Sequence, residues 1–227
     1  MDESMQERSE RTFPLLGGEA LARLASFRIA VFGIGGVGSW CAEALVRSGA
    51  RNLTLVDCDV VAVSNINRQC EATCSTIGVP KVQAMRDRLL SIDPGAEIVA
   101  RMERFTPGSA IGHFDFVVDA IDSVDCKAAL ILAAAKSGTP IVSSMGAALR
   151  TDPTKVEVKP FSKVEGDGLA RALRRRFRVL GERPPQSLRA VCSSEPPAAI
   201  SERGSLMTVT AAFGMALAAE VIKAAMR

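Results

Sequence analysis

Apolar residues along the chain follow two patterns, one typical of buried strands and one typical of helices. Continuous apolar runs, which predict strands covered on both faces, alternate with segments in which apolar residues have helical spacing. This alternation predicts a doubly wound α/β fold with a mainly parallel sheet. The predicted strands span 27–33, 52–57, 96–105, 114–122 and 139–144, and the predicted helices between them span 39–50, 81–93 and 126–138.

After about residue 151 the pattern changes. A strand is predicted at 155–161, an arginine-rich helix at 168–181, a loop rich in proline and serine at 182–205, and a closing helix at 205–227. Loops of this length are usually functional or mobile. We therefore expect one domain over residues 1–227, with a C-terminal extension and a variable helix and loop at about 160–205.

Composition excludes several classes of protein. With 227 residues, 48% of them hydrophobic, the chain is long enough for one substantial domain. The first eleven residues contain no apolar run typical of a signal peptide, which favours the cytoplasm. The apolar segment 206–219 is too short to span a bilayer. Six scattered cysteines predict free thiols, and a net charge of +3 argues against indiscriminate binding of nucleic acid.

A glycine cluster follows the first predicted strand. Gly33, Gly35 and Gly38 match G-x-G-x-x-G between that strand and the next helix, where glycine lets backbone N–H groups approach a phosphate. Asp57 ends the second predicted strand, where dinucleotide-binding folds place an acid for the ribose. These residues predict a nucleotide site and, by themselves, favour a nicotinamide or flavin enzyme.

The polar residues after the second strand favour chemistry at a phosphate instead. A second acid, Asp59, is followed by Asn67, Arg68 and Gln69 in the stretch N-x-N-R-Q, and Lys81 begins the next helix. A guanidinium suits bidentate contact with phosphate, and neighbouring amides can orient it. A dehydrogenase needs only one acid on the ribose, so this cluster lowers the case for hydride transfer.

A further acidic pair ends an apolar strand at the expected ligand edge of the sheet. Asp122 is the preferred candidate ligand for Mg²⁺, and Asp119 has a supporting role because an aspartate at a strand end often caps the following helix. Together with the arginine and lysine, this carboxylate predicts a site for attack on a phosphate.

The arginine-rich helix is amphipathic. Its guanidinium stripe is either a solvated face or a contact for an RNA backbone, and nothing else in the chain supplies comparable local positive charge. Elsewhere, His113 is expected to be structural and Cys192 a small loop thiol without a catalytic role. The candidate RNA-binding residues are Arg171, Arg174, Arg175 and Arg178.

These motifs resemble the adenylating superfamily that includes ThiF, MoeB and the ubiquitin-activating enzymes. The resemblance extends over nearly the whole chain, in the same order. The matching elements are R-x-x-R (Arg8, Arg11), G-x-G-G-x-G-S (Gly33 to Ser39), D-x-D (Asp57, Asp59), N-x-N-R-Q (Asn65 to Gln69), the lysine Lys81 and D-A-I-D (Asp119 to Asp122).

Within the superfamily, the chain is most similar to the tRNA threonylcarbamoyladenosine dehydratases. The resemblance implies a Rossmann-like ThiF/MoeB fold in which ATP adenylates the threonyl carboxylate of the modified adenosine, after which ring closure displaces AMP. The residues that carry this likeness are V-F-G-I-G-G-V-G-S-W, V-D-A-I-D-S-V followed by Lys127, S-S-M-G-A (Ser143 to Ala147), D-P-T-K (Asp152 to Lys155) and Cys192 to Glu195.

The resemblance also implies roles for individual residues. The glycine loop would approach ATP, Asp59 would bind the ribose, and Asp122 would organise Mg²⁺. Arg11 would reach the ATP of a partner subunit, which implies a homodimer. The implied nucleotide-binding set is Gly33, Gly35, Gly36, Gly38, Asp57, Asp59, Asn67, Arg68, Gln69 and Lys81, of which Arg68 and Lys81, with Asp122 and Arg11, would act in catalysis.

Three alternatives stay open from the sequence. The first is an adenylyltransferase of the MoeB or ThiF type that activates a ubiquitin-like sulfur carrier, with a sulfur-transfer protein as a possible partner. The absence of any C-x-x-C pair counts against a zinc-containing form of it. The others are an NAD-dependent oxidoreductase and a dimeric scaffold without catalytic activity.

Overall fold

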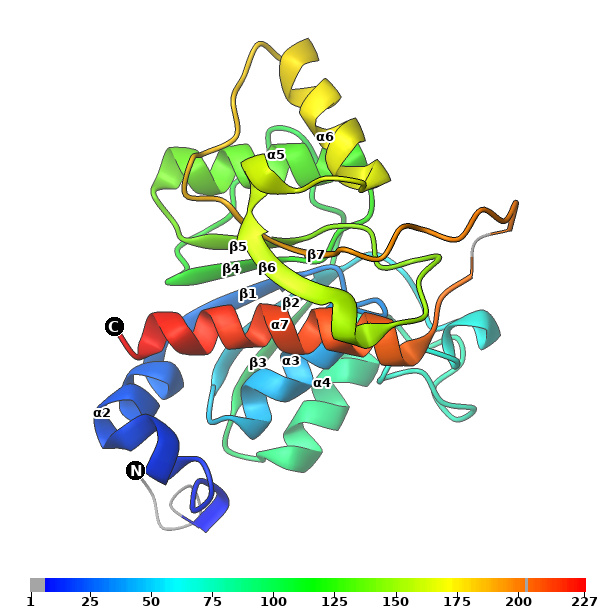
Figure 1. The fold of residues 1–227 in the computed structure, drawn as a ribbon. Helices are drawn as coiled ribbons and strands as arrows, with labels where there is room; N and C mark the ends of the chain where they lie inside the picture. The colour runs from blue at the N-terminus through cyan, green and yellow to red at the C-terminus, as the bar shows by residue number, and fades with distance from the viewer. Residues whose placement is uncertain (1–6, 203) are drawn as a thin grey trace.

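A single seven-stranded sheet forms the centre of the computed structural model, which describes residues 7–202 and 204–227 (Figure 1). The spatial order of the strands is β3-β2-β1-β4-β5-β7-β6. The strands are β1 (Arg28–Phe32), β2 (Asn52–Asp57), β3 (Glu97–Met102), β4 (Phe116–Asp119), β5 (Ile141–Ser144), β6 (Val156–Pro160) and β7 (Arg189–Ser193).

All neighbouring strands in this sheet are parallel except β6 and β7, which are antiparallel. The chain runs outward from β1 through β2 to β3, then returns to place β4 on the other side of β1. The strand order therefore reverses between β1 and β4. In open α/β sheets, ligands bind at such a switch point, beyond the carboxyl ends of the strands.

Helices cover both faces of the sheet, which confirms the predicted doubly wound α/β fold (Figure 1). The helices α3, α4 and α7 pack on one face, with α2 against α7, and α5 and α6 pack on the other. Their bounds are α2 (Phe13–Ser26), α3 (Gly38–Arg47), α4 (Lys81–Ile92), α5 (Val124–Ser137), α6 (Gly168–Val179) and α7 (Met207–Ala225).

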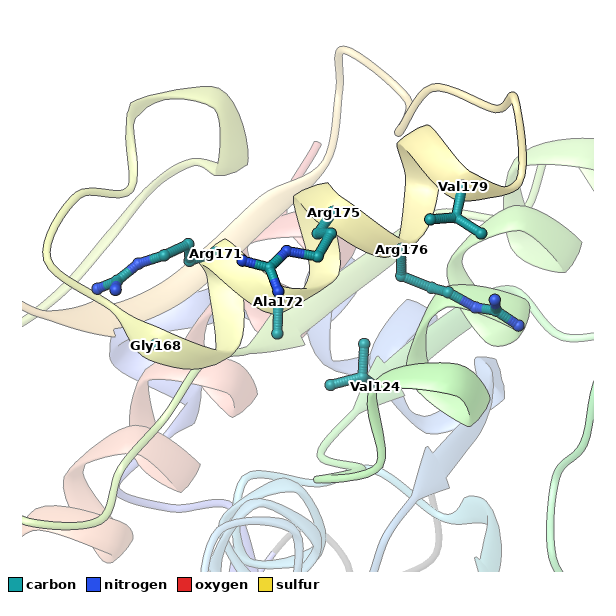
Figure 2. A pocket seen from close by; sticks show the side chains of 7 residues that line it. All are labelled: Val124, Gly168, Arg171, Ala172, Arg175, Arg176 and Val179. Atoms are coloured by element: carbon teal, nitrogen blue, oxygen red, sulfur yellow. The ribbon is translucent and has the colours of Figure 1, made fainter.

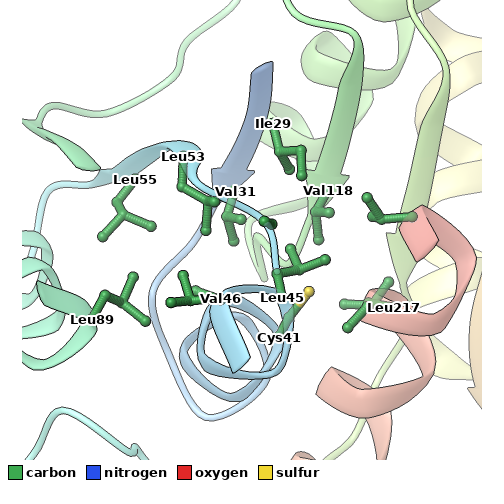
Figure 3. Close-up of a cluster of buried hydrophobic side chains, with 14 of the residues drawn as sticks. Ile29, Val31, Cys41, Leu45, Val46, Leu53, Leu55, Leu89, Val118 and Leu217 are labelled. Atoms are coloured by element: carbon green, nitrogen blue, oxygen red, sulfur yellow. The ribbon is translucent and has the colours of Figure 1, made fainter. Parts of the chain in front are cut away.

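The largest core cluster lies between the central strands and the first of these helical layers (Figure 3). Val31 of β1 and Val118 of β4 face Leu45 of α3 and Leu217 of α7, and all four side chains are fully buried. Each buried aliphatic side chain contributes roughly 1.5–3 kcal/mol. This packing fixes the start of α3 relative to the strand ends.

Helix α7 lies unusually close to α3. A Cβ at Gly214 would be 2.6 Å from the carbonyl oxygen of Val37 and 2.8 Å from Cβ of Trp40, so only glycine permits this approach. Among the described residues, α7 is the one helix long and apolar enough to cross a membrane, but it buries Val209 and Phe213 in the core. Its apolar composition is that of a core helix.

The prediction of a continuous loop over 182–205 is wrong at residues 189–193, which form strand β7. Residues 189–193 pair with β5 on one side and β6 on the other. Flanking Pro184, Pro185 and serine residues dominate the local composition, whereas the strand is fixed by its neighbours in the sheet and by burial of Ala190 and Val191.

Candidate functional site

The glycine loop leaves β1 at the switch point and passes directly over the end of β4. Gly33 has φ +88°, and a Cβ there would lie 2.7 Å from the carbonyl oxygen of Ala120. A Cβ on Gly38 would overlap the carbonyl oxygen of Gly33. The N–H groups of Gly35 and Gly36 make no hydrogen bond to other described residues and precede the N-terminus of α3. This is a backbone arrangement suited to phosphate.

Asp57 holds the glycine loop in place. Its Oδ2 accepts a 2.6 Å hydrogen bond from the N–H of Ile34, and its Oδ1 accepts one of 2.8 Å from the N–H of Asp59. The carboxylate therefore joins the loop after β1 to the loop after β2. This contact makes Asp57 a positioning residue for both loops.

Asp59 and Lys81 form an ion pair beside the glycine loop. Lys81 Nζ lies 3.0 Å from Asp59 Oδ2, and the lysine side chain is buried, whereas that of Asp59 is 56% exposed. The Lys81 hydrogen bond lowers the pKa of Asp59 despite its partial burial. The exposed carboxylate can turn to a ligand's hydroxyls, and the ammonium group of Lys81 is then available to an anion.

Arg68 is held over the glycine loop by several contacts. Its Nη1 donates to the carbonyl oxygen of Ser64 at 2.8 Å and to Asn67 Oδ1 at 2.9 Å, and its own carbonyl oxygen accepts from Trp40 Nε1 at 2.9 Å. A Cβ at Gly36 would be 3.2 Å from Cγ of Arg68. A glycine at this position therefore accommodates the arginine stem.

The amides on either side of Arg68 differ in environment. Asn67 Nδ2 donates to the carbonyl oxygen of Ser205, which connects this loop to the segment before α7. Gln69 is buried, and its Oε1 has no hydrogen-bond partner among the described residues. A Cβ on Gly35 would lie 3.7 Å from Gln69 Nε2, so this amide packs against the glycine loop.

A fully buried ion pair fixes the end of β4. Lys127 Nζ lies 2.7 Å from Asp119 Oδ2, and the Ser143 hydroxyl donates to the same oxygen at 2.6 Å. Asp119 Oδ1 accepts from the N–H of Ile121. Asp122 is exposed beyond this turn and makes no hydrogen bond or ion pair with the other residues that the structure describes. It is thus a free carboxylate at the edge of the loop, as a metal ligand requires.

The structure does not bring Arg11 to the other predicted site residues of the same chain. Arg11 is exposed in the turn before α2. The neighbouring Arg8 binds Asp93 at 3.0 Å, just after α4 and before β3. This places the segment at the amino edge of the sheet, whereas Gly33 lies at the carboxyl edge.

The predicted arginine stripe of α6 divides into inward and outward groups. Arg174 donates to the carbonyl oxygens of Phe161 and Val164 and lies over the Phe161 ring at 5.0 Å, so it supports the fold. Arg171 and Arg175 are exposed and line a surface hollow of about 330 Å³.

This hollow lies close in sequence and space to the end of β4. Its far wall includes Val124, two residues after Asp122 (Figure 2). Arg176, at its rim, is paired with Asp125 at 2.8 Å, and Arg178 is exposed on the same helix. Arg171 and Arg175, which form no ion pair with the other described residues, therefore lie near the start of α5, two residues after Asp122.

The prediction of free thiols is confirmed, whereas Cys192 lies on strand β7 and not in the predicted loop. All six cysteines are free thiols. Burial raises the pKa of Cys192 to about 11, which keeps its thiol protonated at neutral pH. A protonated thiol is a poor nucleophile.

This geometry matches a known family along almost the entire chain. The model of the ThiF family matches residues 7–227. The chain belongs to the ThiF family. A tRNA threonylcarbamoyladenosine dehydratase of Bacillus subtilis is 39% identical over 191 residues, which are 82% of this chain and 74% of that protein.

Solved structures give the same picture of this ThiF protein. The crystal structure of Escherichia coli tRNA N6-threonylcarbamoyladenosine dehydratase, TcdA, in complex with ATP superimposes with a TM-score of 0.94 at 35% identity, covering 99% of this chain and 96% of that chain. The molybdopterin-synthase adenylyltransferase of E. coli is more distant, at 33% identity over 170 residues, 74% of this chain and 65% of that protein.

Sequence reasoning missed two residues at this site. Trp40 was assigned no role by the motifs, and its indole N–H donates to the backbone carbonyl oxygen of Arg68. Glu71 was not considered, although it is buried between the N-termini of α3 and α4. The available sequence signal for Glu71 was an acidic residue next to a cysteine, two positions after Gln69.

Proposed function

We propose that this protein is an ATP-dependent tRNA threonylcarbamoyladenosine dehydratase. It adenylates the threonyl carboxylate of the modified adenosine, and ring closure then releases AMP with net loss of water. The observation that carries the proposal is the glycine loop crossed by Arg68 and flanked by Lys81, in a chain that matches an ATP-bound dehydratase over 99% of its length.

The chemical problem is the poor electrophilicity of a carboxylate. Attack of the carboxylate oxygen on the α-phosphorus of ATP forms an acyl-phosphate bond and breaks the bond to pyrophosphate. A nucleophile within the threonylcarbamoyl group then attacks the activated carbonyl carbon, and AMP leaves. Negative charge grows on the phosphates in the first step, so fixed cations aimed at them stabilise the transition state.

The residues of the site fit these requirements. The N–H groups of Gly35 and Gly36 would approach the phosphates, Asp59 would accept hydrogen bonds from the ribose, and Arg68 and Lys81 would neutralise the growing charge. Asn67 would orient the guanidinium of Arg68, to which its side-chain oxygen is already bonded.

The exposed, unpaired carboxylate of Asp122 fits a hard divalent cation. It would hold Mg²⁺, which would offset phosphate charge. Asp119, which is paired with the buried Lys127, accepts a hydrogen bond from the N–H of Ile121 and so supports the turn that would present Asp122.

A homodimer would complete the site. Arg11 lies at the opposite edge of the sheet from its own glycine loop, so it can act on ATP only in another subunit. The resemblance to adenylating enzymes whose N-terminal arginine crosses to the partner supports this arrangement.

We further propose that the hollow beside α6 contacts the tRNA backbone. Arg171 and Arg175 are exposed there, close to the loop that carries Asp122, and phosphates attract free guanidinium groups. Arg174 is not among the proposed RNA contacts, because its guanidinium is bonded to the backbone of the protein. Arg178 is exposed and is proposed as a peripheral RNA contact.

The test of the function is direct. Purified protein is incubated with ATP, Mg²⁺ and tRNA that carries threonylcarbamoyladenosine, and the nucleosides are analysed by mass spectrometry. Loss of one water from the modified nucleoside is expected, together with AMP. If the nucleoside mass stays unchanged while a ubiquitin-like sulfur carrier supports AMP formation, the MoeB-type adenylyltransferase is the correct alternative.

Variants test the assigned roles in the same reaction. K81A and R68A should each slow the chemical step about 10²- to 10³-fold, the scale for removing one donor to a transition-state oxygen. K136A, an exposed lysine at the far end of α5, is the matched control and should leave the rate unchanged. Near-normal AMP formation by K81A would refute its role.

The RNA contact is tested by salt dependence. The double variant R171A/R175A should reduce the slope of log K against log salt by up to about 2, since each lost phosphate contact reduces it by roughly 1. The control K136A/K223A removes the same charge from the amino edge and should not change the slope. Equal slopes for R171A/R175A and the wild type would exclude this surface.

A further inference from the structure

One buried carboxyl group beside the nucleotide loop has no partner. Glu71 is 2% exposed, and neither Oε1 nor Oε2 has a hydrogen-bond partner among the described residues. Its backbone is fixed, because the Thr76 hydroxyl donates to its carbonyl oxygen at 2.8 Å. Burying an ionised carboxylate without a partner costs free energy. The environment of Glu71 therefore favours its neutral form.

The groups around Glu71 already have other partners. From α3, the Ser39 hydroxyl lies near it but donates to the carbonyl oxygen of Gly35 at 2.7 Å. From α4, Lys81 is close enough to interact with it electrostatically, but its Nζ is bonded to Asp59. From the end of β2, Asp57 adds negative charge that disfavours ionisation.

The other side of Glu71 is a buried network. The adjacent Cys70 thiol donates to Glu43 at 3.2 Å, and Glu43 is paired with Arg88 and Arg47. Burial raises the pKa of the Cys70 thiol. Both arginines of this network are engaged by Glu43, and Lys81 is the cation that acts on Glu71.

Burial, opposed in part by the positive charge of Lys81, raises the pKa of Glu71 to about 7. The group therefore changes charge near neutral pH. When it is ionised, its negative charge interacts with Lys81, the lysine that is paired with Asp59.

We propose that Glu71 is a positioning residue that couples ATP binding to proton uptake: in its neutral form it leaves the charge of Lys81 to the phosphates, and in its ionised form it opposes their binding. This inference rests on the proposed role of Lys81 at the phosphates. It assigns Glu71 no contact with ATP, because the side chain is buried.

The direction of the effect follows from charge. Phosphates near Lys81 bring further negative charge toward Glu71 and make its neutral form more favourable in the complex than in the free protein. Binding then takes up a proton at pH values between the two pKa values, and affinity falls as pH rises above about 7, by up to about tenfold per pH unit. Below pH 6 the carboxyl group is neutral in both states and the coupling disappears.

The experiment is calorimetric titration of the full-length protein with ATP and Mg²⁺ from pH 6 to pH 9, each in two buffers of different ionisation enthalpy. The wild type should bind more weakly as pH rises above 7 and should take up protons. E71Q, which has the shape of the neutral form, should show neither effect beyond the titration of ATP itself. E220Q, a carboxyl group at the opposite edge of the sheet, should behave as the wild type.

Two outcomes would overturn the inference. One is a pH profile of E71Q that coincides with that of the wild type, and the other is absence of protein-linked proton uptake by the wild type between pH 7 and pH 8, which requires no variant. Either outcome is compatible with ATP binding and dehydratase activity, so it would overturn only the role proposed for Glu71. Failure of the wild type to bind ATP at all would overturn the proposed function as well.

Discussion

Replacing Glu71 by glutamine should change how the stability of the protein depends on pH. The substitution keeps the shape of the neutral carboxyl group and removes its ionisation. Because the folded protein holds the pKa of Glu71 at about 7, against an ordinary value of 4.5, the folded state binds the proton more tightly than the unfolded chain does. Stability from this group is fully present below pH 4 and is lost as pH rises to 7.

The size of the effect follows from the two pKa values. Their difference corresponds to about 3 kcal/mol of unfolding free energy, of which about 2.5 kcal/mol is lost between pH 5 and pH 8. The side chain is 2% exposed, so solvent screening reduces this little. E71Q cannot lose this stabilisation, because glutamine does not ionise. The unfolding free energy of E71Q should therefore rise relative to that of the wild type by about 2.5 kcal/mol between pH 5 and pH 8.

Urea unfolding followed by far-ultraviolet circular dichroism at pH 5, 6, 7 and 8 measures this directly. The control is E220Q. Lys223 and Arg189 outweigh the burial of Glu220 and lower its pKa, so its ionised form is the favoured one and its removal should produce no gain with rising pH. A constant stability difference between E71Q and the wild type from pH 5 to pH 8 would refute the reasoning.

Three further changes have defined expectations. G38A should weaken ATP binding at least about tenfold, because its Cβ would overlap a carbonyl oxygen of the glycine loop. The control G168A, whose Cβ would have no atom within 4 Å, should bind ATP normally. Equal affinities of the two variants in calorimetry would contradict this prediction. K127M should lower the unfolding free energy by about 3–5 kcal/mol in urea by leaving a buried aspartate unpaired, and a loss below about 1 kcal/mol would argue against an ionised pair. R11A and K81A should each be inactive alone, but after mixing and subunit exchange they should regain about a quarter of wild-type activity, since chance pairing restores one complete site in half of the dimers. No recovery would place Arg11 outside the partner's site.

The central elements and much of the candidate site could be predicted from local sequence. Continuous apolar runs with glycine after the first of them indicate parallel strands and a nucleotide loop, because burial on both faces leaves no polar alternation. The same reasoning found Asp59, Arg68 and Lys81 by residue type and spacing. Their mutual contacts, such as the ion pair of Asp59 with Lys81, depend on strand order and could not be read from spacing.

Local residue patterns are sufficient to predict the parallel core, the nucleotide loop and the set of charged residues that follow the strands. Which of those charges are available to a ligand depends on the folded chain: Arg174 is bonded to the carbonyl oxygens of Phe161 and Val164, and Arg11 lies at the far edge of the sheet. The tertiary structure also made a strand of residues 189–193 and buried Glu71 without a partner. The physical reason is that residue type fixes which charge and hydrogen-bonding groups a position carries, whereas burial and partners, which decide what those groups do, come from segments distant in the chain.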